Sequence, residues 1–133
     1  ANITDADPII DEERYRDGFK SSDIFVYHLK KLRISPKEKI KTLLVFDADR
    51  QNIYNKDIEK NKYFEEQKKY LSALLLENGF SVIDLEDNFQ KEYDLTKRKF
   101  EFVNDGHWNS LGHKVVAKSI EDKIIKIKNF YYK

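Results

Sequence analysis

Two short apolar runs, separated by one long amphipathic segment, limit most narrowly how this chain folds. The first run, IKTLLVFDAD (40–49), clusters Ile, Leu, Val and Phe between lysine and aspartates, as does a strand buried on both faces of a parallel sheet. The second run, FSVIDL (80–85), is a second short buried strand by the same criteria. Between them, residues 55–79 carry apolar positions at helical spacing and end at an Asn-Gly pair, which predicts a long helix. Strand, helix and strand in this order predict an α/β fold with parallel strands.

Helices are also predicted on either side of this unit. SSDIFVYHLKKLRI (21–34) has helical spacing, with Ser22 or Asp23 as the N-cap, and Ser35-Pro36 is expected to end that helix, because proline disfavours the helical conformation in the residue before it. A weaker helix is predicted over roughly 86–93. A final helix follows Asn109 and runs to about residue 127, because five apolar positions form one helical face: Leu111, Val115, Ile120, Ile124 and Ile127.

The organisation that follows is half of a domain with short flanks. Residues 1–22 are acidic and are expected to be a poorly ordered lead-in, and residues 128–133 are an aromatic and basic tail. Residues 23–127 would be the C-terminal half of one α/β domain, because a sheet usually needs three or more strands for independent stability. The 133 residues include no methionine, although a freshly translated chain begins with one. We therefore expect residues needed for function to lie upstream of Ala1.

Composition excludes several classes of function. The formal net charge is +1, from 25 basic and 24 acidic residues, which gives no support for a nucleic-acid partner or an anionic membrane. No run reaches the about 18 apolar residues of a membrane span. The absence of cysteine excludes disulfides and thiolate metal sites.

The stretch NDGHWNSLGHKVVAKSI (104–120) carries the chemistry of the chain. A neutral imidazole moves protons near neutral pH, and a carboxylate on its other ring nitrogen holds it in one tautomer. Asp105 and His107 are separated by Gly106 alone, and in a tight turn these positions place a short carboxylate against Nδ1, with Gly106 free to adopt the backbone dihedrals required. Trp108 would shield the pair from water, and Asn109 would cap the helix that begins at Ser110.

Plainer interpretations stand beside this one. Asp-Gly is a common turn dipeptide, so the stretch also fits a turn with a helix cap. A metal site built from His107, His113 and Asp105 lacks the usual helical spacing of two histidines. His113 is expected to pack on the first turn of the last helix, and His28 to be a partly buried structural histidine.

Asp47, Asp49 and Arg50 follow the first predicted strand. In open α/β sheets, sites gather at the carboxyl ends of strands, so these residues are candidates for site-shaping or substrate binding. A charged loop edge is the alternative, and Tyr54 is expected to be a packing aromatic.

DGHWNSLGHKVVAKSI resembles the last conserved block of the SGNH/GDSL hydrolases, in which the Asp and His of a Ser-His-Asp triad precede the final helix. The Asp-x-His-Trp form is similar to that of the O-acetyltransferase-like branch, one residue shorter than the common Asp-x-x-His. KTLLVFDADRQNIY and LLLENGFSVIDLEDNF resemble upstream segments of the same proteins, so the resemblance covers roughly residues 40–126. It implies the C-terminal portion of a three-layer α/β/α, flavodoxin-like parallel-sheet domain.

The resemblance also implies a function: a serine esterase or O-acetyltransferase that acts on acyl, chiefly acetyl, esters of carbohydrate or on a small ester. An enzyme of this kind needs no cofactor and no metal. The resemblance also places the parent protein outside the cytoplasm, in the cell envelope. The family's Gly-Asp-Ser nucleophile turn and its oxyanion glycine and asparagine blocks are missing, so this chain alone is expected to be inactive and to need an upstream segment of its parent. A non-catalytic α/β domain that binds carbohydrate or protein is the alternative, and apolar surface left by missing strands would favour a homo-oligomer. The implied site residues are His107 as base and Asp105 as its partner. Trp108 and Asn109 beside them, and Asp49 and Arg50 after the first predicted strand, are expected to bind substrate or shape the site.

Overall fold

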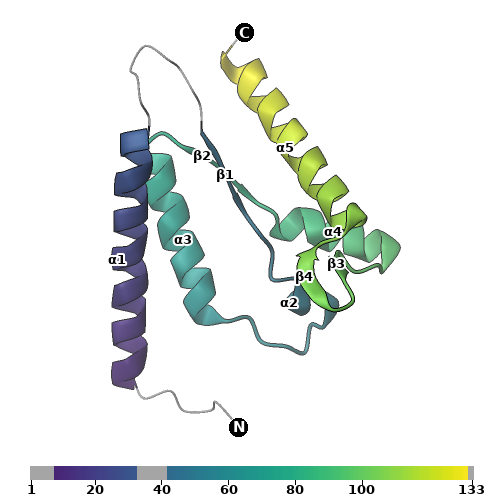
Figure 1. The fold of residues 1–133 in the computed structure, drawn as a ribbon, viewed down its shortest axis with the longest axis horizontal. Helices are drawn as coiled ribbons and strands as arrows, with labels where there is room; N and C mark the ends of the chain where they lie inside the picture. Colours follow the sequence, from purple (N-terminus) through teal and green to yellow (C-terminus); the bar gives the residue numbers. More distant parts are fainter. Residues whose placement is uncertain (1–7, 33–41, 132–133) are drawn as a thin grey trace. The chain divides into compact units, whose positions relative to one another are not determined.

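The computed structural model describes residues 8–32 and 42–131 (Figure 1). These residues belong to two compact units. One comprises the described residues of Ala1–Leu43 with Asn61–Val82, and the other comprises Leu44–Lys60 with the described residues of Ile83–Lys133. Among the described helices, none combines the length and the apolar character that crossing a bilayer requires.

The first unit is built on two helices, α1 (Pro8–Leu32) and α3 (Lys62–Glu77), which lie side by side. Tyr15 meets Tyr63 at 5.4 Å between ring centroids and Phe19 meets Tyr70 at 4.4 Å, so the two helices run in the same direction. The Tyr70 hydroxyl also donates to Asp23, at 2.7 Å. These aromatic contacts help to join the pair, because apolar side chains on one helix stripe gain stability by leaving water.

The start of α1 differs from the sequence prediction. The helix begins at Pro8, so Ser22 is not its N-cap but a buried mid-helix residue whose hydroxyl donates to the Gly18 carbonyl at 3.0 Å. Residues 8–22 of the expected lead-in are helical because the aromatic positions that pack on α3 extend upstream of Ser22. Residues 1–7 and the predicted stop at Ser35-Pro36 lie outside the described residues.

The two predicted strands are present as β1 (Leu43–Phe46) and β2 (Ser81–Asp84). Ser81 N–H donates to the Thr42 carbonyl and Leu85 N–H to the Phe46 carbonyl, each at 3.1 Å. From the first of these bonds to the second, the residue number rises by four on each strand, so the strands are parallel. The fold is mixed helix and strand, as the α/β prediction requires. Among the described residues, this sheet has two strands. The four residues of β1 are all half-buried, so the prediction of a strand buried on both faces is wrong for β1.

The helix between these strands is shorter than predicted, and a further helix precedes it. Helix α2 (Arg50–Tyr54) was not predicted, and α3 begins at Lys62 because the Asn61 side chain caps it, accepting from Tyr63 N–H at 3.0 Å. The predicted stop is confirmed, since Asn78 is the C-cap and Gly79 adopts a positive φ of 77°.

The second unit continues with α4 (Glu86–Thr96), the strands β3 (Glu101–Phe102) and β4 (Asp105–Trp108), and α5 (Ser110–Tyr131). We call β3, β4 and their turn the hairpin. Phe89 of α4 and Phe100 before β3 are both fully buried and pack edge to face at 4.5 Å between centroids. Helix α4 contacts both α2 and α5. The Phe89 ring also lies 6.5 Å from that of Trp108 in β4, so this aromatic pair packs in the core next to the hairpin. Helix α5 extends past the predicted end at residue 127, so residues 128–131 of the expected tail are helical.

Candidate active site

Asp105 and His107 lie on a short strand with an irregular register. Glu101 pairs with Trp108 and Phe102 pairs with Asp105, antiparallel. Between these pairs β3 advances by one residue and β4 by three, so Gly106 and His107 have no Cα partner on β3. An insertion of this kind re-aims side chains and leaves backbone groups outside the ladder. The predicted tight turn at Gly106 is wrong: Gly106 belongs to β4 and does not have a positive φ.

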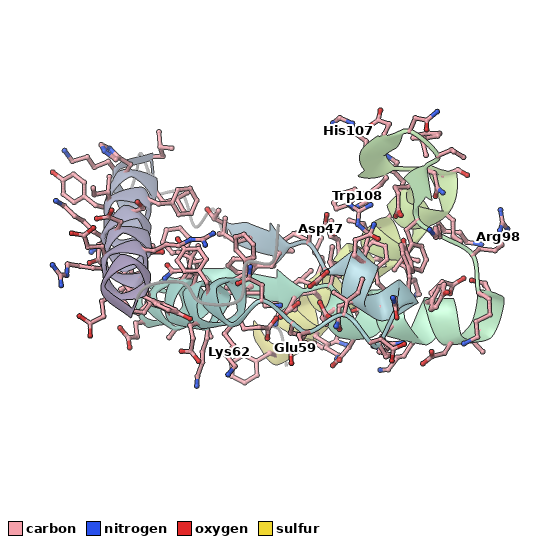
Figure 2. All side chains as sticks on the ribbon, turned by 90° about the horizontal axis from the view of Figure 1, so that it is seen from below. Asp47, Glu59, Lys62, Arg98, His107 and Trp108 are labelled. Atoms are coloured by element: carbon pink, nitrogen blue, oxygen red, sulfur yellow. The ribbon has the colours of Figure 1, made fainter. Side chains whose placement is uncertain are left out.

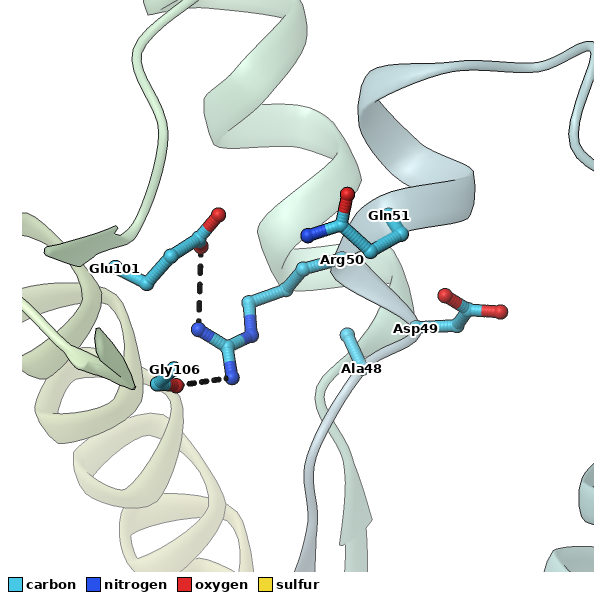
Figure 3. A pocket seen from close by; sticks show the side chains of 6 residues that line it. All are labelled: Ala48, Asp49, Arg50, Gln51, Glu101 and Gly106. Atoms are coloured by element: carbon cyan, nitrogen blue, oxygen red, sulfur yellow. Dashed lines mark hydrogen bonds and ion pairs between the residues drawn. The ribbon is translucent and has the colours of Figure 1, made fainter. Parts of the chain in front are cut away.

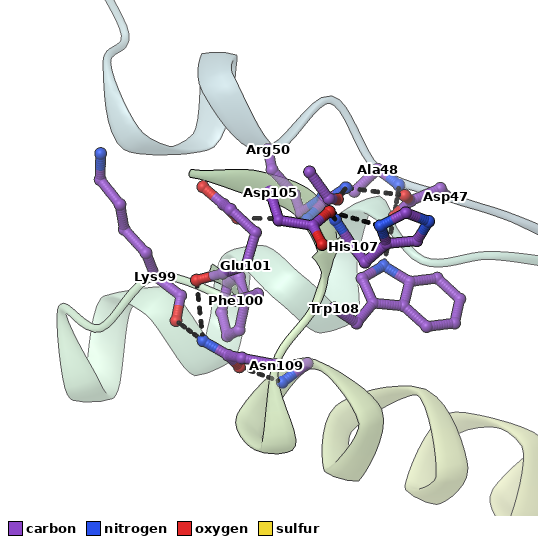
Figure 4. A network of polar contacts seen from close by, with 12 residues as sticks. Asp47, Ala48, Arg50, Lys99, Phe100, Glu101, Asp105, His107, Trp108 and Asn109 are labelled. Atoms are coloured by element: carbon purple, nitrogen blue, oxygen red, sulfur yellow. Dashed lines mark hydrogen bonds and ion pairs between the residues drawn. The ribbon is translucent and has the colours of Figure 1, made fainter. Parts of the chain in front are cut away.

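The structure brings Asp105 and His107 together (Figure 4). Nδ1 of His107 contacts Oδ1 of Asp105, and the backbone N–H of His107 donates to the same oxygen at 2.9 Å. These two hydrogen bonds, the backbone one first, hold the pKa of the Asp105 carboxyl below its usual value. The carboxylate is therefore ionised at neutral pH and stabilises the tautomer with hydrogen on Nδ1. Nε2 has no hydrogen-bond partner among the described residues, so a basic nitrogen is left open.

Exposure of the pair differs from the expectation for Trp108. The His107 side chain is 88% exposed and that of Asp105 53%, and Figure 2 shows His107 projecting from the hairpin. Trp108 does not shield them. Its indole N–H donates to Asp47 at 3.2 Å, and its ring meets that of His113 at 5.6 Å, near perpendicular. Trp108 thus packs at the base of the hairpin, and the predicted shielding is wrong for this chain.

Asn109 joins the hairpin to α5. Its Oδ1 accepts from Gly112 N–H at 3.0 Å, which confirms the predicted helix cap. Its Nδ2 donates to the carbonyls of Lys99 at 2.9 Å and Glu101 at 3.1 Å, and its backbone N–H donates to Phe100 at 2.7 Å. Asn109 shapes the site, because it fixes where β4 ends and the helix begins.

The two candidates from the β1 edge have different roles. Asp49 is the N-cap of α2, accepting from Asn52 N–H at 3.1 Å, so its carboxylate serves the helix. Arg50 reaches the hairpin. Its Nη2 donates to the Gly106 carbonyl at 2.8 Å, and its Nη1 lies 3.2 Å from Glu101. Asp49 and Arg50 both line an open pocket of about 230 Å³ beside Gly106 (Figure 3).

Sequence reasoning missed Glu101 and the polar role of Tyr54. The Tyr54 hydroxyl donates to Glu101 Oε2 at 2.5 Å and accepts from Phe100 N–H at 2.9 Å. Burial, and then the hydrogen bond to Glu101, raise the pKa of Tyr54 well above its usual value. Glu101 is 13% exposed and paired with Arg50, but no spacing in the sequence sets it apart from the other 23 acidic residues.

The remaining histidines belong to packing contacts or to the surface. His113 lies in the first turn of α5 against Trp108, as expected. His28 was expected to be partly buried but is exposed on α1, in edge contact with Tyr27 at 5.4 Å. Within residues 8–32 and 42–131, no three His, Asp or Glu side chains gather where they could hold a metal ion.

Gly106 in β4 and Gly112 in the first turn of α5 give a matched stability test. A Cβ on Gly106 would meet nothing within 4 Å, whereas one on Gly112 would lie 2.6 Å from the Phe100 carbonyl and 2.9 Å from Trp108 Cβ. We predict that Gly112→Ala lowers the free energy of unfolding by about 1–3 kcal/mol through overpacking, although alanine favours helix. Gly106→Ala should leave it unchanged or raise it by up to about 1 kcal/mol. Urea unfolding of both variants checks this, and equal losses would contradict the close approach of α5 to the hairpin.

The Asp105–His107 pair presents one oriented imidazole and can offer its second ring nitrogen to an incoming hydroxyl. Arg50 and Asn109 hydrogen-bond to the backbone within and after this pair, at Gly106 and Gly112. Comparison of the chain with protein-family models, with curated proteins and with solved structures finds no match.

Proposed function

We propose that this chain supplies the histidine and aspartate of a Ser-His-Asp triad in an SGNH/GDSL-like serine esterase or O-acetyltransferase. The observation that carries the proposal is the contact of His107 Nδ1 with Asp105 Oδ1, while no residue that the structure describes hydrogen-bonds to Nε2. An imidazole held this way accepts a proton at Nε2, which is what a general base for a serine hydroxyl requires.

In the proposed reaction, the serine hydroxyl attacks the ester carbonyl while His107 Nε2 takes its proton. Collapse of the tetrahedral intermediate breaks the ester bond, and the imidazolium returns that proton to the leaving alcohol. Water or an acceptor hydroxyl then repeats the sequence on the acyl-serine. Asp105 keeps its negative charge throughout and stabilises the imidazolium.

The nucleophile and the oxyanion donors belong, in this proposal, to residues outside the 133. None of the seven serines stands in a Gly-Asp-Ser turn: Ser21, Ser22, Ser35, Ser72, Ser81, Ser110 and Ser119. By the same proposal, β1 and β2 are two strands of a three-layer α/β/α sheet whose other strands lie in that outside segment. Such a segment would also cover His107, since electrostatic catalysis is strongest where water is excluded.

The proposed substrate is an acyl ester of a carbohydrate, with acetyl as the acyl group. Support comes from the pocket beside Gly106, whose lining includes a guanidinium, two carboxylates and the Gln51 amide. Polar groups of this kind suit the hydroxyls of a sugar acceptor better than an apolar chain.

Ester hydrolysis by the full-length natural gene product tests the proposal, with p-nitrophenyl acetate as the substrate. We expect measurable hydrolysis that falls about 1,000-fold or more in His107→Ala. His113→Ala is the matched control, because His113 lies at the start of α5, close to the hairpin, but contacts Trp108 rather than Asp105. This variant should keep most of the activity. Equal rates in wild type and His107→Ala would reject the assignment of the base.

A non-catalytic carbohydrate- or protein-binding domain is the second candidate. The observation that favours it is the exposure of His107, since an 88% exposed imidazole lacks the dry surroundings of an active site. This candidate predicts a full-length protein that is folded and hydrolyses no ester.

A further inference from the structure

The guanidinium of Arg50 lies where three segments of the second unit meet. Nη1 is 3.2 Å from Glu101 of β3, and Nη2 is 3.2 Å from Asp47 after β1 and 2.8 Å from the Gly106 carbonyl of β4. The Arg50 side chain is only 15% exposed. Arg50 presents a planar fork of fixed donors, so one side chain can hold three acceptors at set angles.

Strand β4 needs a substitute for a missing ladder contact at this point. Gly106 and His107 fall in the irregular part of the register and face no Cα partner on β3. In a regular antiparallel pair the opposite strand would hold such residues by backbone hydrogen bonds. Here the Gly106 carbonyl accepts from Arg50 and the His107 N–H donates to Asp105.

We infer that Arg50 is the positioning residue of the Asp105–His107 pair, through its hydrogen bond to the Gly106 carbonyl that separates them. Gly106 is the residue whose backbone determines how the Asp105 carboxylate and the His107 ring face each other. Arg50 links the Gly106 carbonyl to α2 and, through Glu101, to β3. This link therefore fixes the backbone that carries the Asp105 and His107 side chains. The catalytic consequence, though not the geometry, rests on the proposed function.

The partners of Arg50 are themselves held. Glu101 accepts from the Tyr54 hydroxyl at 2.5 Å, and Asp47 accepts from the Trp108 indole at 3.2 Å and from Ala48 N–H at 2.8 Å. Both carboxylate acceptors of the guanidinium are thus held by further contacts, which limits where the guanidinium can lie. Because protein acceptors already occupy both of its terminal nitrogens, Arg50 shapes the site, and substrate binding is not its main role.

Arg50→Lys tests the inference, with Arg98→Lys as the matched control. Lysine keeps the charge beside Glu101 but has no fork to hold three acceptors, while Arg98 is exposed before β3. In the 133-residue chain, the 15N shifts of the His107 ring nitrogens are read through the carbon-bound ring protons, at a pH where the imidazole is neutral. We expect hydrogen mainly on Nδ1 in wild type and Arg98→Lys, and a mixture of tautomers in Arg50→Lys with an unchanged circular dichroism spectrum.

A second variant decides the question if Arg50→Lys does not fold. Arg50→Gln combined with Glu101→Gln removes the cation and its half-buried partner together, so the Glu101 carboxylate is not left uncompensated. The more exposed Asp47 keeps its hydrogen bonds from Trp108 and Ala48. The same mixture of tautomers is expected in this double variant. Ring-nitrogen shifts identical to wild type in a folded Arg50 variant would overturn the inference.

Activity of the full-length protein separates the inference from the proposed function. If both hold, Arg50→Lys lowers kcat for ester hydrolysis by about 100-fold with little change in KM, as misplacement of a base does. Normal ring shifts and a normal rate in this variant, beside an active wild type, would reject the role of Arg50 alone. Altered ring shifts beside an inactive wild type would leave Arg50 as the positioning residue and reject the esterase.

Discussion

Asp105→Asn is expected to lower the rate of the proposed ester hydrolysis by about 10³- to 10⁴-fold while leaving the fold intact. The Asp105 carboxylate accepts from both the ring and the backbone N–H of His107. An asparagine amide can still accept from the backbone, but its NH₂ group would donate to Nδ1 and so stabilise the opposite tautomer. Nε2 would then carry hydrogen and could not take a proton from the nucleophile. Steady-state kinetics of the full-length gene product measures the effect.

The matched control for this substitution is Asp87→Asn, an equally conservative change at an exposed position in the first turn of α4. Its rate should stay within about twofold of wild type, as expected for a surface position. A loss below about 10-fold in Asp105→Asn would show that the carboxylate does not set the state of the imidazole.

Phe100→Ala is expected to lower the free energy of unfolding by about 3–5 kcal/mol. The Phe100 ring is fully buried, packs edge to face on Phe89, and lies 6.1 Å from the Tyr54 ring. Removing it leaves a cavity under the hairpin and removes an aromatic pair that contributes beyond its buried area. Equilibrium unfolding in urea measures the difference.

Phe102→Ala is the control, because Phe102 lies two residues along the chain but is 56% exposed. Its cost should stay within about 0.5 kcal/mol, as for surface positions. Similar losses in the two variants would contradict the placement of Phe100 in the core and of Phe102 at the surface.

Local rules succeeded where a local cause decides the structure. The predicted strands at 40–49 and 80–85 are present as the two parallel strands β1 and β2, and Asn109 is a helix cap, as its position before the helix predicts. In the same way, Asn78-Gly79 ended α3, because the residue after a helix often needs a positive φ, which glycine accommodates without strain.

The parts missed by the sequence depend on contacts between distant residues. The hairpin escaped prediction because β3 has two residues and β4 includes a glycine, so neither shows the alternation of a strand. Its shape depends on Arg50, which lies 56 residues before Gly106. The upstream turns of α1 were missed because their aromatic side chains pack on α3, and packing of this kind overrides a local capping signal such as Ser22.

The most direct test of the central claim uses a fluorophosphonate probe on the full-length natural gene product, read by intact mass. A serine activated by His107 would attack phosphorus, displace fluoride and give one stoichiometric adduct. We expect that adduct on wild type and on His113→Ala, and its absence or a rate about 1,000-fold lower on His107→Ala. No adduct on a folded wild type, or equal labelling of His107→Ala, would show that the Asp105–His107 pair activates no nucleophile.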